Sequence, residues 1–328
     1  MKSTFEIGGL KVESGSRSKG ILRVGPYFYH KRAHIRKRIS IPFTVVNGID
    51  DGPVFCVTGG LHPTEYAGIS AAIRLSNEVD PKDLKGAVVI VPVFNIPGYE
   101  ERTYICPIDG VNLQGNFPGR PDGTISQLIV YRVFNELIKK ANYYVDLHGG
   151  DIHESELCNA YFYRTGDEAI DSKSEGIARA LGFKYVVAHA TGESEGSSLR
   201  VPADHGIPCA LCECNQGDRL LLDEASKVFE GLLNVMRYLM MINGQPRKIE
   251  GQEIRSEIAW ITIEHGGLLH TEVKPGDLLS KDDIIGEVKD LHGNVVETVR
   301  SPFKGLVLFM IHNPKVEPGE KMIQLLKE

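Results

Sequence analysis

The stretch that decides the fold is PVFCVTGGLHPTEYAG, residues 53–68, where an apolar run ends in two glycines before a histidine and a glutamate. The apolar run has the composition of a buried strand, and residues 64–79 have the apolar spacing of a helix. His62 and Glu65 therefore lie where a strand gives way to a helix, and Pro63 suits the first helical position. The pair predicts either a metal site or an ordinary helix start with a charged residue in its first turn.

Outward from this stretch, strands and helices alternate along the chain. Apolar composition predicts buried strands at GAVVIVPVFN, YYVDLH, NAYFYR, KYVVAHA and PCALCEC. Helices are expected at TISQLIVYRVFNELIKK and over residues 167–181 and 218–242. Parallel strands need helical crossovers, which cover both faces of the sheet. The order of elements therefore predicts an α/β fold with a mainly parallel mixed sheet flanked by helices.

A different pattern begins after NGQPRKIEGQ, residues 243–252. Short β-like runs alternate there with turns at KPGD, DLHGN, SPFKG and EPGE, which is typical of a small all-β barrel or sandwich. We therefore predict two domains, a larger one over residues 1–248 and a small β domain over residues 249–328. Residues 1–50 are expected to add edge strands to the larger domain.

Composition excludes several classes of protein. With 42% hydrophobic and 24% charged residues, the chain is globular and not disordered. A net charge of −6 argues against nucleic acid as a partner, so the basic run at residues 30–38 is interpreted as a solvated strand face and not as a nucleic-acid patch. The stretch FEGLLNVMRYLMMI is too short and too polar to span a bilayer, and the N-terminus lacks a signal peptide. We expect a cytoplasmic protein that binds neither nucleic acid nor membrane.

The six cysteines lie mostly inside apolar runs. Because no export signal accompanies them, reduced thiols are the simplest expectation. Cys209 and Cys212 have the spacing of a metal-binding pair, but the sequence contains no second C-x-x-C pair. Core thiols are therefore favoured over a metal site at these two positions.

Two further strand ends carry residues of chemical interest. YYVDLHGG contains His148, and strand alternation places Asp146 on the same face, either to orient a ligand imidazole or as a buried structural carboxylate. PCALCEC carries Glu213 in an otherwise apolar strand, where a lone carboxylate needs a partner or a chemical role. Each alone is compatible with a structural residue. Together with His62 and Glu65, however, His148 completes the three-ligand set of catalytic zinc sites, which keep a fourth position for water.

The motifs GGLHPTE, NIPGYEER, VNLQGNFPG, DLHGG and PCALCE occur in this order. They resemble the succinylglutamate desuccinylase/aspartoacylase family, whose pattern runs G-G-x-H-x-x-E, N-P-x-x-x-x-x-R, D-L-N-R-x-F-P-G, D-L-H and P-x-x-x-x-E. The match extends from about residue 40 to about residue 240, and the β-rich tail resembles the family's C-terminal domain. The resemblance implies a fold similar to that of zinc carboxypeptidases, with residues 1–248 as the catalytic domain.

The resemblance also implies roles for individual residues. His62, Glu65 and His148 would hold one zinc ion per chain, Glu213 would take a proton from the attacking water, and Arg102 would polarise the carbonyl that is cleaved. Elementary chemistry agrees with each role. Zinc lowers the pKa of water to about 7, a carboxylate shuttles the proton to the leaving amine, and a fixed cation stabilises the developing oxyanion.

One departure from the family pattern concerns the substrate. Relatives grip a substrate carboxylate through an Asn-Arg pair, which is replaced in this chain by Gln114 and Gly115. The candidates for substrate contacts are then Asn112, Gln114 and Arg120, of which the last follows the FPG motif. Two hypotheses stay open: Arg120 replaces the lost grip, or the substrate has changed. We favour an acylated amine whose carboxylate is absent or held elsewhere.

The sequence thus predicts a zinc-dependent amidohydrolase, a deacylase that cleaves an N-acyl group from a small amine or amino acid with metal-activated water. Two alternatives remain, a carboxypeptidase-like metallopeptidase with the same metal site and a non-enzymatic relative that binds ligand in a retained pocket. The tail over residues 253–328 is expected to supply no zinc ligand and to shape access to the site. The sequence is compatible with a homo-oligomer but fixes neither the acyl group nor the amine.

Overall fold

The structure is a computed structural model of the whole chain, and it describes residues 4–30, 35–189, 195–217 and 219–328. The basic run expected to form a solvated strand face includes residues 31–34, which lie outside the described residues. No helix in the described part of the chain is long and apolar enough to cross a membrane.

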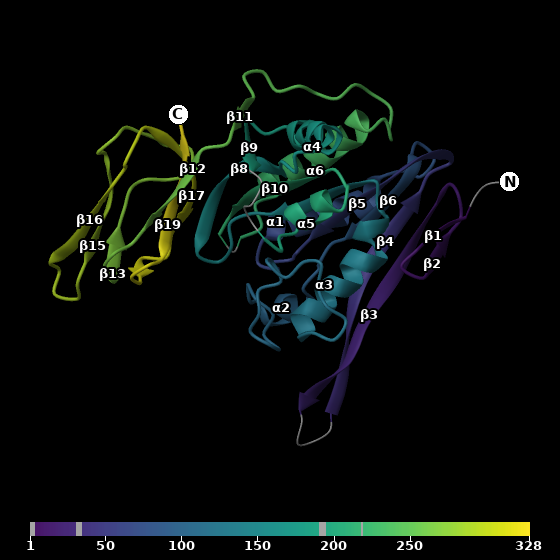
Figure 1. Cartoon of the computed structure of the whole chain (residues 1–328), viewed down its shortest axis with the longest axis horizontal. Helices are drawn as coiled ribbons and strands as arrows, with labels where there is room; N and C mark the ends of the chain where they lie inside the picture. The colour runs from purple at the N-terminus through teal and green to yellow at the C-terminus, as the bar shows by residue number, and fades with distance from the viewer. Residues whose placement is uncertain (1–3, 31–34, 190–194, 218) are drawn as a thin grey trace.

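A large mixed sheet runs through the centre of the molecule (Figure 1). In the described part of the chain it has thirteen strands, and ten of them follow the order β12-β19-β17-β8-β10-β7-β5-β6-β4-β3. Its strands are β3 (Ser16–His30), β4 (Ile35–Asn47), β5 (Asp50–Gly59), β6 (Lys85–Val91), β7 (Tyr143–His148), β8 (Glu154–Tyr163), β9 (Tyr185–His189), β10 (Cys209–Gln216), β11 (Glu253–Arg255), β12 (Ile258–Thr262), β14 (Leu278–Leu279), β17 (Gly305–Ile311) and β19 (Lys321–Lys327).

The central strands of this sheet are parallel. β6, β5, β7 and β10 pair in parallel, as do β8, β9 and β11, while β8 joins β10 in the antiparallel sense. The long β3–β4 hairpin adds antiparallel strands at one edge, and β17, β19 and β12 add them at the other. The parallel centre with antiparallel edges confirms the predicted α/β class and its mainly parallel mixed sheet.

Helices cover both faces of the sheet. They are α1 (Tyr66–Glu78), α2 (Ile96–Glu101), α3 (Ile125–Glu136), a 3₁₀ turn (Ile138–Lys140), α4 (Glu168–Ala180), α5 (Arg200–Asp204) and α6 (Leu222–Tyr238). Because successive side chains of a strand point to opposite faces, Phe55 and Val57 join α1, α4 and α6 in one core. Cys56 and Tyr144 join α3 in the other. The sheet is therefore buried on both sides, and its functional groups can reach a ligand only at the strand ends.

The C-terminal part of the chain forms a second, antiparallel sheet, which shares an apolar core with β17 and β19 of the large sheet. The second sheet has the order β16 (Val295–Arg300), β15 (Ile284–Lys289), β13 (Gly267–His270) and β18 (Lys315–Val316), and Figure 1 shows it at the yellow-green end of the molecule. The neighbouring β17 pairs with β8, so C-terminal strands also extend the large sheet. A short hairpin of β1 (Phe5–Ile7) and β2 (Leu10–Val12) begins the described chain. The domain boundary near residue 248 stays a prediction.

The cysteines differ from expectation at one pair. Cys158 of β8 and Cys214 of β10 form a disulfide, so the expectation of six reduced thiols is wrong for these two. The physical reason is that β8 and β10 are adjacent antiparallel strands, which bring the two Cα atoms to 4.1 Å. Cys209 and Cys212 are buried free thiols, as predicted.

Candidate metal centre

The backbone at two neighbouring strand ends positions the candidate ligands. β5 and β7 are parallel neighbours, so both end at the same edge of the sheet. After β5 the chain turns at Gly60, whose φ of +59° lies in the left-handed region that glycine adopts without strain. After β7, a side chain at Gly149 would bring its Cβ within 2.5 Å of the Cβ of Asn215. The two Gly-Gly pairs thus permit tight turns just where His62 and His148 are presented.

The turn that carries His62 and Glu65 is not yet helical. α1 begins at Tyr66, so the predicted helix start at Pro63 is wrong by three residues. Glu65 occupies the N-cap position, but its side chain makes no capping hydrogen bond. The carboxylate is instead directed at the two imidazoles, and the Glu65 amide closes the turn by donating to the His62 carbonyl at 3.2 Å.

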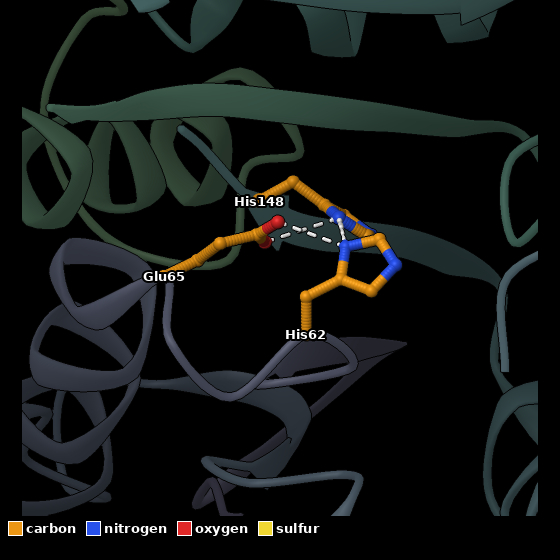
Figure 2. Close-up of side chains that lie close together, drawn as sticks. All are labelled: His62, Glu65 and His148. Atoms are coloured by element: carbon orange, nitrogen blue, oxygen red, sulfur yellow. Dashed lines mark hydrogen bonds and ion pairs between the residues drawn. The ribbon is translucent and has the colours of Figure 1, made fainter. Parts of the chain in front are cut away.

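His62, Glu65 and His148 converge as a buried group, which we call the ligand cluster (Figure 2). Its ligand atoms all lie within 4.8 Å of one another. His62 Nδ1 lies 2.8 Å from Glu65 Oε1, and His148 Nδ1 lies 3.2 Å from Glu65 Oε2. The two Nδ1 atoms are themselves only 3.2 Å apart. The structure therefore brings together the three residues that the sequence named as metal ligands.

Neighbouring acceptors fix which nitrogen of each imidazole carries a proton. Asn112 Oδ1 lies 3.1 Å from His62 Nε2 and also accepts from the Gln114 amide, which identifies it as an acceptor. Asp146 Oδ2 lies 2.9 Å from His148 Nε2. Both Nε2 atoms are therefore donors, and both Nδ1 atoms face the centre of the ligand cluster. Acceptors such as Asn112 and Asp146, which hold the ring nitrogen that faces away from the metal, are typical of histidines that bind a metal.

Buried Asp146 also accepts a hydrogen bond from Thr58 Oγ1 at 2.5 Å, and the same hydroxyl lies 2.7 Å from the hydroxyl group of Tyr144. Burial raises the pKa of Asp146, but His148 and the hydroxyl groups of Ser198 and Thr58 lower it by more, so the carboxylate stays ionised. Asp146 and His148 lie on one face of β7, as strand alternation predicted. The geometry suits an aspartate that orients an imidazole.

The electrostatics of the ligand cluster suit a cation. Burial lowers the pKa of His148, but Asp146 and Glu65 outweigh it and raise the pKa well above its ordinary value. Glu65 Oε2 is buried and, although 3.2 Å from His148 Nδ1, it has no hydrogen-bond partner of good geometry in the described chain. A site that favours positive charge and holds an orphaned carboxylate oxygen fits a divalent ion. Two imidazoles and one carboxylate are a common protein ligand set for zinc.

A cavity of about 340 Å³ opens beside the ligand cluster. Beyond that cluster, the described residues that line it are Tyr104, Gln114, Gly149, Glu154, Glu156, Tyr161, His189, Ser197, Leu199, Leu211, Glu213, Ile258, Trp260, Phe309 and Gln324. Four of them belong to the C-terminal strands β12, β17 and β19, so the tail contributes to the wall of this cavity. That the tail controls access to the site stays a prediction. None of the described tail residues belongs to the ligand cluster.

Three carboxyl groups, Glu154, Glu156 and Glu213, form an acidic wall of this cavity. Glu213 lies beside His148 in the parallel pairing of β10 with β7. Burial and the nearby Glu156 raise the pKa of Glu213 well above its usual range. Burial is also the main reason why the pKa of Glu154 and the pKa of Glu156 are both raised to about 8. Each carboxyl group thus has a raised affinity for protons.

His148 is the one nearby group whose positive charge partly offsets the burial of Glu156 among the described residues. The side chain of Glu156 is buried, and Asn159 Nδ2 donates to its Oε1 at 3.2 Å. The carboxyl group of Glu213 also forms a hydrogen bond with that of Glu156. Neither Asn159 nor Glu213 is positively charged, and the described residues that line the cavity include no lysine or arginine. The acidic wall is therefore open to a cation from outside the protein.

The other residues singled out in the sequence lie in different places. Gln114 lines the cavity and accepts from the Ser198 amide at 2.9 Å, and Asn112 contacts His62. Arg102 is exposed at the C-terminal end of α2 and is absent from the described cavity lining. Arg120 is also exposed and pairs with Asp122 at 3.4 Å, outside that lining.

Several cavity residues were not singled out from the sequence. A signal existed for Glu154 and Glu156, because two carboxylates spaced i and i+2 in a strand share a face. Tyr104, Trp260 and Phe309 have no comparable local signal. The tail residues reach the cavity only because distant strands pair, with Phe309 opposite Glu156 in the β17–β8 ladder.

Solved structures share this fold. The product-bound ectoine utilization protein EutE (DoeB) from Ruegeria pomeroyi aligns over 95% of each chain with a TM-score of 0.87 and 24% identity. A succinylglutamate desuccinylase/aspartoacylase from Rhodobacter sphaeroides aligns over 95% of this chain and 96% of its own, with a TM-score of 0.83 and 23% identity. At these identities the likeness defines the fold class and nothing further.

The family follows from the sequence comparison. The model of the succinylglutamate desuccinylase/aspartoacylase catalytic domain matches residues 51–239, more than half of the chain, and the protein belongs to this family. A curated relative, the N-alpha-acetyl-L-2,4-diaminobutyric acid deacetylase of Halomonas elongata, is 26% identical over 257 residues, which are 77% of this chain and 75% of the relative. The predicted family membership is confirmed.

Proposed function

We propose that this protein is a zinc-dependent deacylase that hydrolyses the amide bond of a small N-acylated amine. The observation that carries the proposal is the convergence of His62, Glu65 and His148 within 4.8 Å, beside a cavity that also receives Glu213. The curated relative that bears the name of a deacetylase supports the same class of reaction. One zinc ion per chain is the expected content.

A zinc ion held by the ligand cluster would supply a Lewis acid and would lower the pKa of water to about 7, so that hydroxide becomes available at neutral pH. The chain supplies the remaining parts. Asn112 and Asp146 hold the two imidazoles by their Nε2 atoms, so the rings keep one orientation. Glu213 takes the proton of the attacking water and passes it to the leaving amine. Its raised proton affinity, from burial and from Glu156, suits a base that must later act as an acid.

The charge of the cavity favours a substrate that carries a second, positively charged amine. Glu154 and Glu156 belong to the acidic wall, and the described lining offers no lysine or arginine to a substrate carboxylate. A diamine acylated on one nitrogen keeps an ammonium group on the other, which such a wall attracts. The substrate named for the curated relative is a diamino acid acetylated on one amine. A monoacylated diamine or diamino acid is therefore the substrate class that we propose.

The same observation weighs against the peptidase alternative. A carboxypeptidase needs a cation for the C-terminal carboxylate of its substrate, and an arginine forms this contact best because its flat fork binds both oxygens. Neither Arg102 nor Arg120 lines the cavity. We therefore rank deacylation of a small amine above peptide hydrolysis.

The test combines metal analysis with a substrate panel. Purified protein is analysed for zinc, and kcat/KM is measured for Nα-acetyl-2,4-diaminobutyrate, N-acetylaspartate, N-succinylglutamate and hippuryl-phenylalanine. We expect about one zinc per chain, fastest hydrolysis of the acetylated diaminobutyrate, and loss of activity with a chelator that added zinc reverses. Full activity of metal-free protein would contradict the proposal, as would a zinc-loaded protein that hydrolyses none of the panel.

A further inference from the structure

Amide hydrolysis builds negative charge on the carbonyl oxygen, and enzymes place hydrogen-bond donors where that charge develops. The family resemblance implied this task for Arg102, which is exposed and outside the described cavity lining. We propose that the hydroxyl group of Tyr104 donates a hydrogen bond to the developing oxyanion of the substrate amide. The inference rests on the proposed deacylase function and adds a catalytic residue to it.

Tyr104 is the cavity residue that stacks on the ligand cluster. Its ring lies over the imidazole of His62 with 3.9 Å between ring centres and 23° between the planes. The side chain lines the cavity together with His62, Glu65 and His148. A substrate carbonyl that approaches the ligand cluster through this cavity therefore passes alongside the phenol.

The turn after α2 explains why Tyr104, and not Arg102, faces the cavity. Arg102 ends the helix in the left-handed conformation, with φ of 56° and ψ of 49°. The next residue anchors the turn, since the Thr103 amide donates to the Gly98 carbonyl at 2.9 Å and its hydroxyl donates to the Ile105 carbonyl at 2.8 Å. This backbone reversal leaves the arginine in solvent and presents the tyrosine to His62.

Other donors in the described lining are less suited to the task. The hydroxyl of Tyr161 is already engaged, because it donates to Gln324 Oε1 at 2.9 Å. Gln114 accepts from the Ser198 amide through Oε1, and no hydrogen bond joins its side chain to the ligand cluster in the described chain. Trp260 and Gln324 belong to the C-terminal strands β12 and β19. Tyr104 combines a hydroxyl donor with direct contact to a residue of the ligand cluster.

The side chain of Tyr104 ends in a phenol hydroxyl, which can donate one hydrogen bond. The residue is largely buried in the cavity wall, where few water molecules compete for that donor. In such a buried site, a developing oxyanion depends on a fixed donor more than it would in water.

Tyr104→Phe is the decisive variant, because it removes one oxygen and keeps the ring that stacks on His62. Turnover of the acetylated diaminobutyrate, expressed per bound zinc, should fall by roughly 10²–10³ in kcat, as for loss of one oxyanion donor. KM should stay within about threefold, since the hydrogen bond forms only in the transition state. Tyr99→Phe, on the exposed side of α2, is the matched control and should behave as wild type.

A binding measurement gives a readout that does not depend on turnover. In a methylphosphonamidate analogue of the substrate, a tetrahedral phosphorus replaces the carbonyl carbon, so its oxygens imitate the oxyanion. Calorimetry should show that Tyr104→Phe weakens binding of this analogue at least tenfold, while binding of the product diaminobutyrate changes less than threefold.

The outcomes separate this inference from the proposed function. If wild-type protein hydrolyses the acetylated diaminobutyrate and Tyr104→Phe keeps its kcat within threefold, the role of Tyr104 is overturned and the deacylase proposal stands. Equal weakening of analogue and product would likewise overturn it, because the hydroxyl would then be a general binding contact. A zinc-loaded wild type without deacylase activity overturns both.

Discussion

The ligand cluster and the acidic wall lie in one cavity but are held in different ways. In the ligand cluster, each imidazole has its Nε2 atom fixed by a buried acceptor, Asn112 for His62 and Asp146 for His148. In the acidic wall, Glu156 is bonded by an amide and by another carboxyl group, and no lysine or arginine stands in the described lining. The side chains of the ligand cluster are thus fixed in an arrangement that suits a cation, whereas the carboxyl groups of the acidic wall have no lysine or arginine beside them in the described lining.

This difference separates two requirements of an enzyme. The ligand cluster has the geometry that the class of reaction needs, and it comes from the ends of two parallel strands. The acidic wall comes from β8 and β10. In the same cavity lie Trp260 and Phe309 from the C-terminal strands. Burial raises the proton affinity of the carboxyl groups of the acidic wall, and a bound cationic group would favour their ionised form. The comparison therefore predicts that changes in the ligand cluster abolish the reaction, whereas changes in the wall alter the choice of substrate.

The largest effect is expected from His148→Ala. The change removes one of the three proposed ligands and leaves buried Asp146 without its partner, so zinc should be lost along with deacylase activity. Elemental analysis of the purified variant measures the metal directly. His270→Ala, an exposed histidine of β13, should keep about one zinc per chain. Full zinc content in His148→Ala would remove His148 from the ligand set.

A smaller loss is expected from Glu213→Gln. Glu213 belongs to the acidic wall and lies beside His148 of the ligand cluster. The change keeps the shape and removes the basic oxygen, so kcat should fall about 10²–10⁴-fold while the zinc content is unchanged. The exposed Glu230→Gln on α6 is the matched control. If turnover of Glu213→Gln stays within a few-fold of wild type, another group must carry the proton.

The residue pairs in and around the ligand cluster that lie close together in sequence could be predicted. His62 and Glu65 lie three residues apart in one turn, and Asp146 and His148 alternate along one strand, so short-range geometry was enough to group them. The α/β class was predictable for the same reason, since apolar periodicity is a local property. The start of α1 was misplaced because the side chain of Glu65 contacts two imidazoles and leaves the helix end uncapped.

The remaining features depend on contacts between distant segments. The Cys158–Cys214 disulfide follows from β8 lying next to β10, a neighbour that the order of the chain does not dictate. The contribution of Phe309 follows from the pairing of β17 with β8, more than 140 residues away in sequence. Arg102 and Tyr104 are two residues apart, and a single left-handed residue decides which of them faces the cavity.

The comparison is sharpened by Glu156→Gln, tested with two substrates of equal shape. Nα-acetyl-2,4-diaminobutyrate ends in an ammonium group, and N-acetylnorvaline has a methyl group at the same place. A charge-assisted contact contributes about 1.5–3 kcal/mol, which corresponds to roughly 10–100-fold in kcat/KM. The variant should lose that factor for the cationic substrate and change less than about threefold for the neutral one. Equal losses for both substrates would mean that Glu156 acts on the chemistry and does not recognise charge.

The smallest effects are expected for the substrate carboxylate, which relatives bind through the Asn-Arg pair that this chain lacks. The described cavity lining offers no guanidinium, and Arg120 is exposed beside Asp122. Amidation of the carboxylate of Nα-acetyl-2,4-diaminobutyrate should therefore lower kcat/KM by less than about tenfold, far below the loss expected when an arginine fork is deprived of its partner. Arg120→Ala should leave the kinetics of both compounds unchanged. If amidation instead costs a hundredfold, the carboxylate is strongly bound. A parallel loss in Arg120→Ala would then identify Arg120 as the group that replaced the Asn-Arg pair.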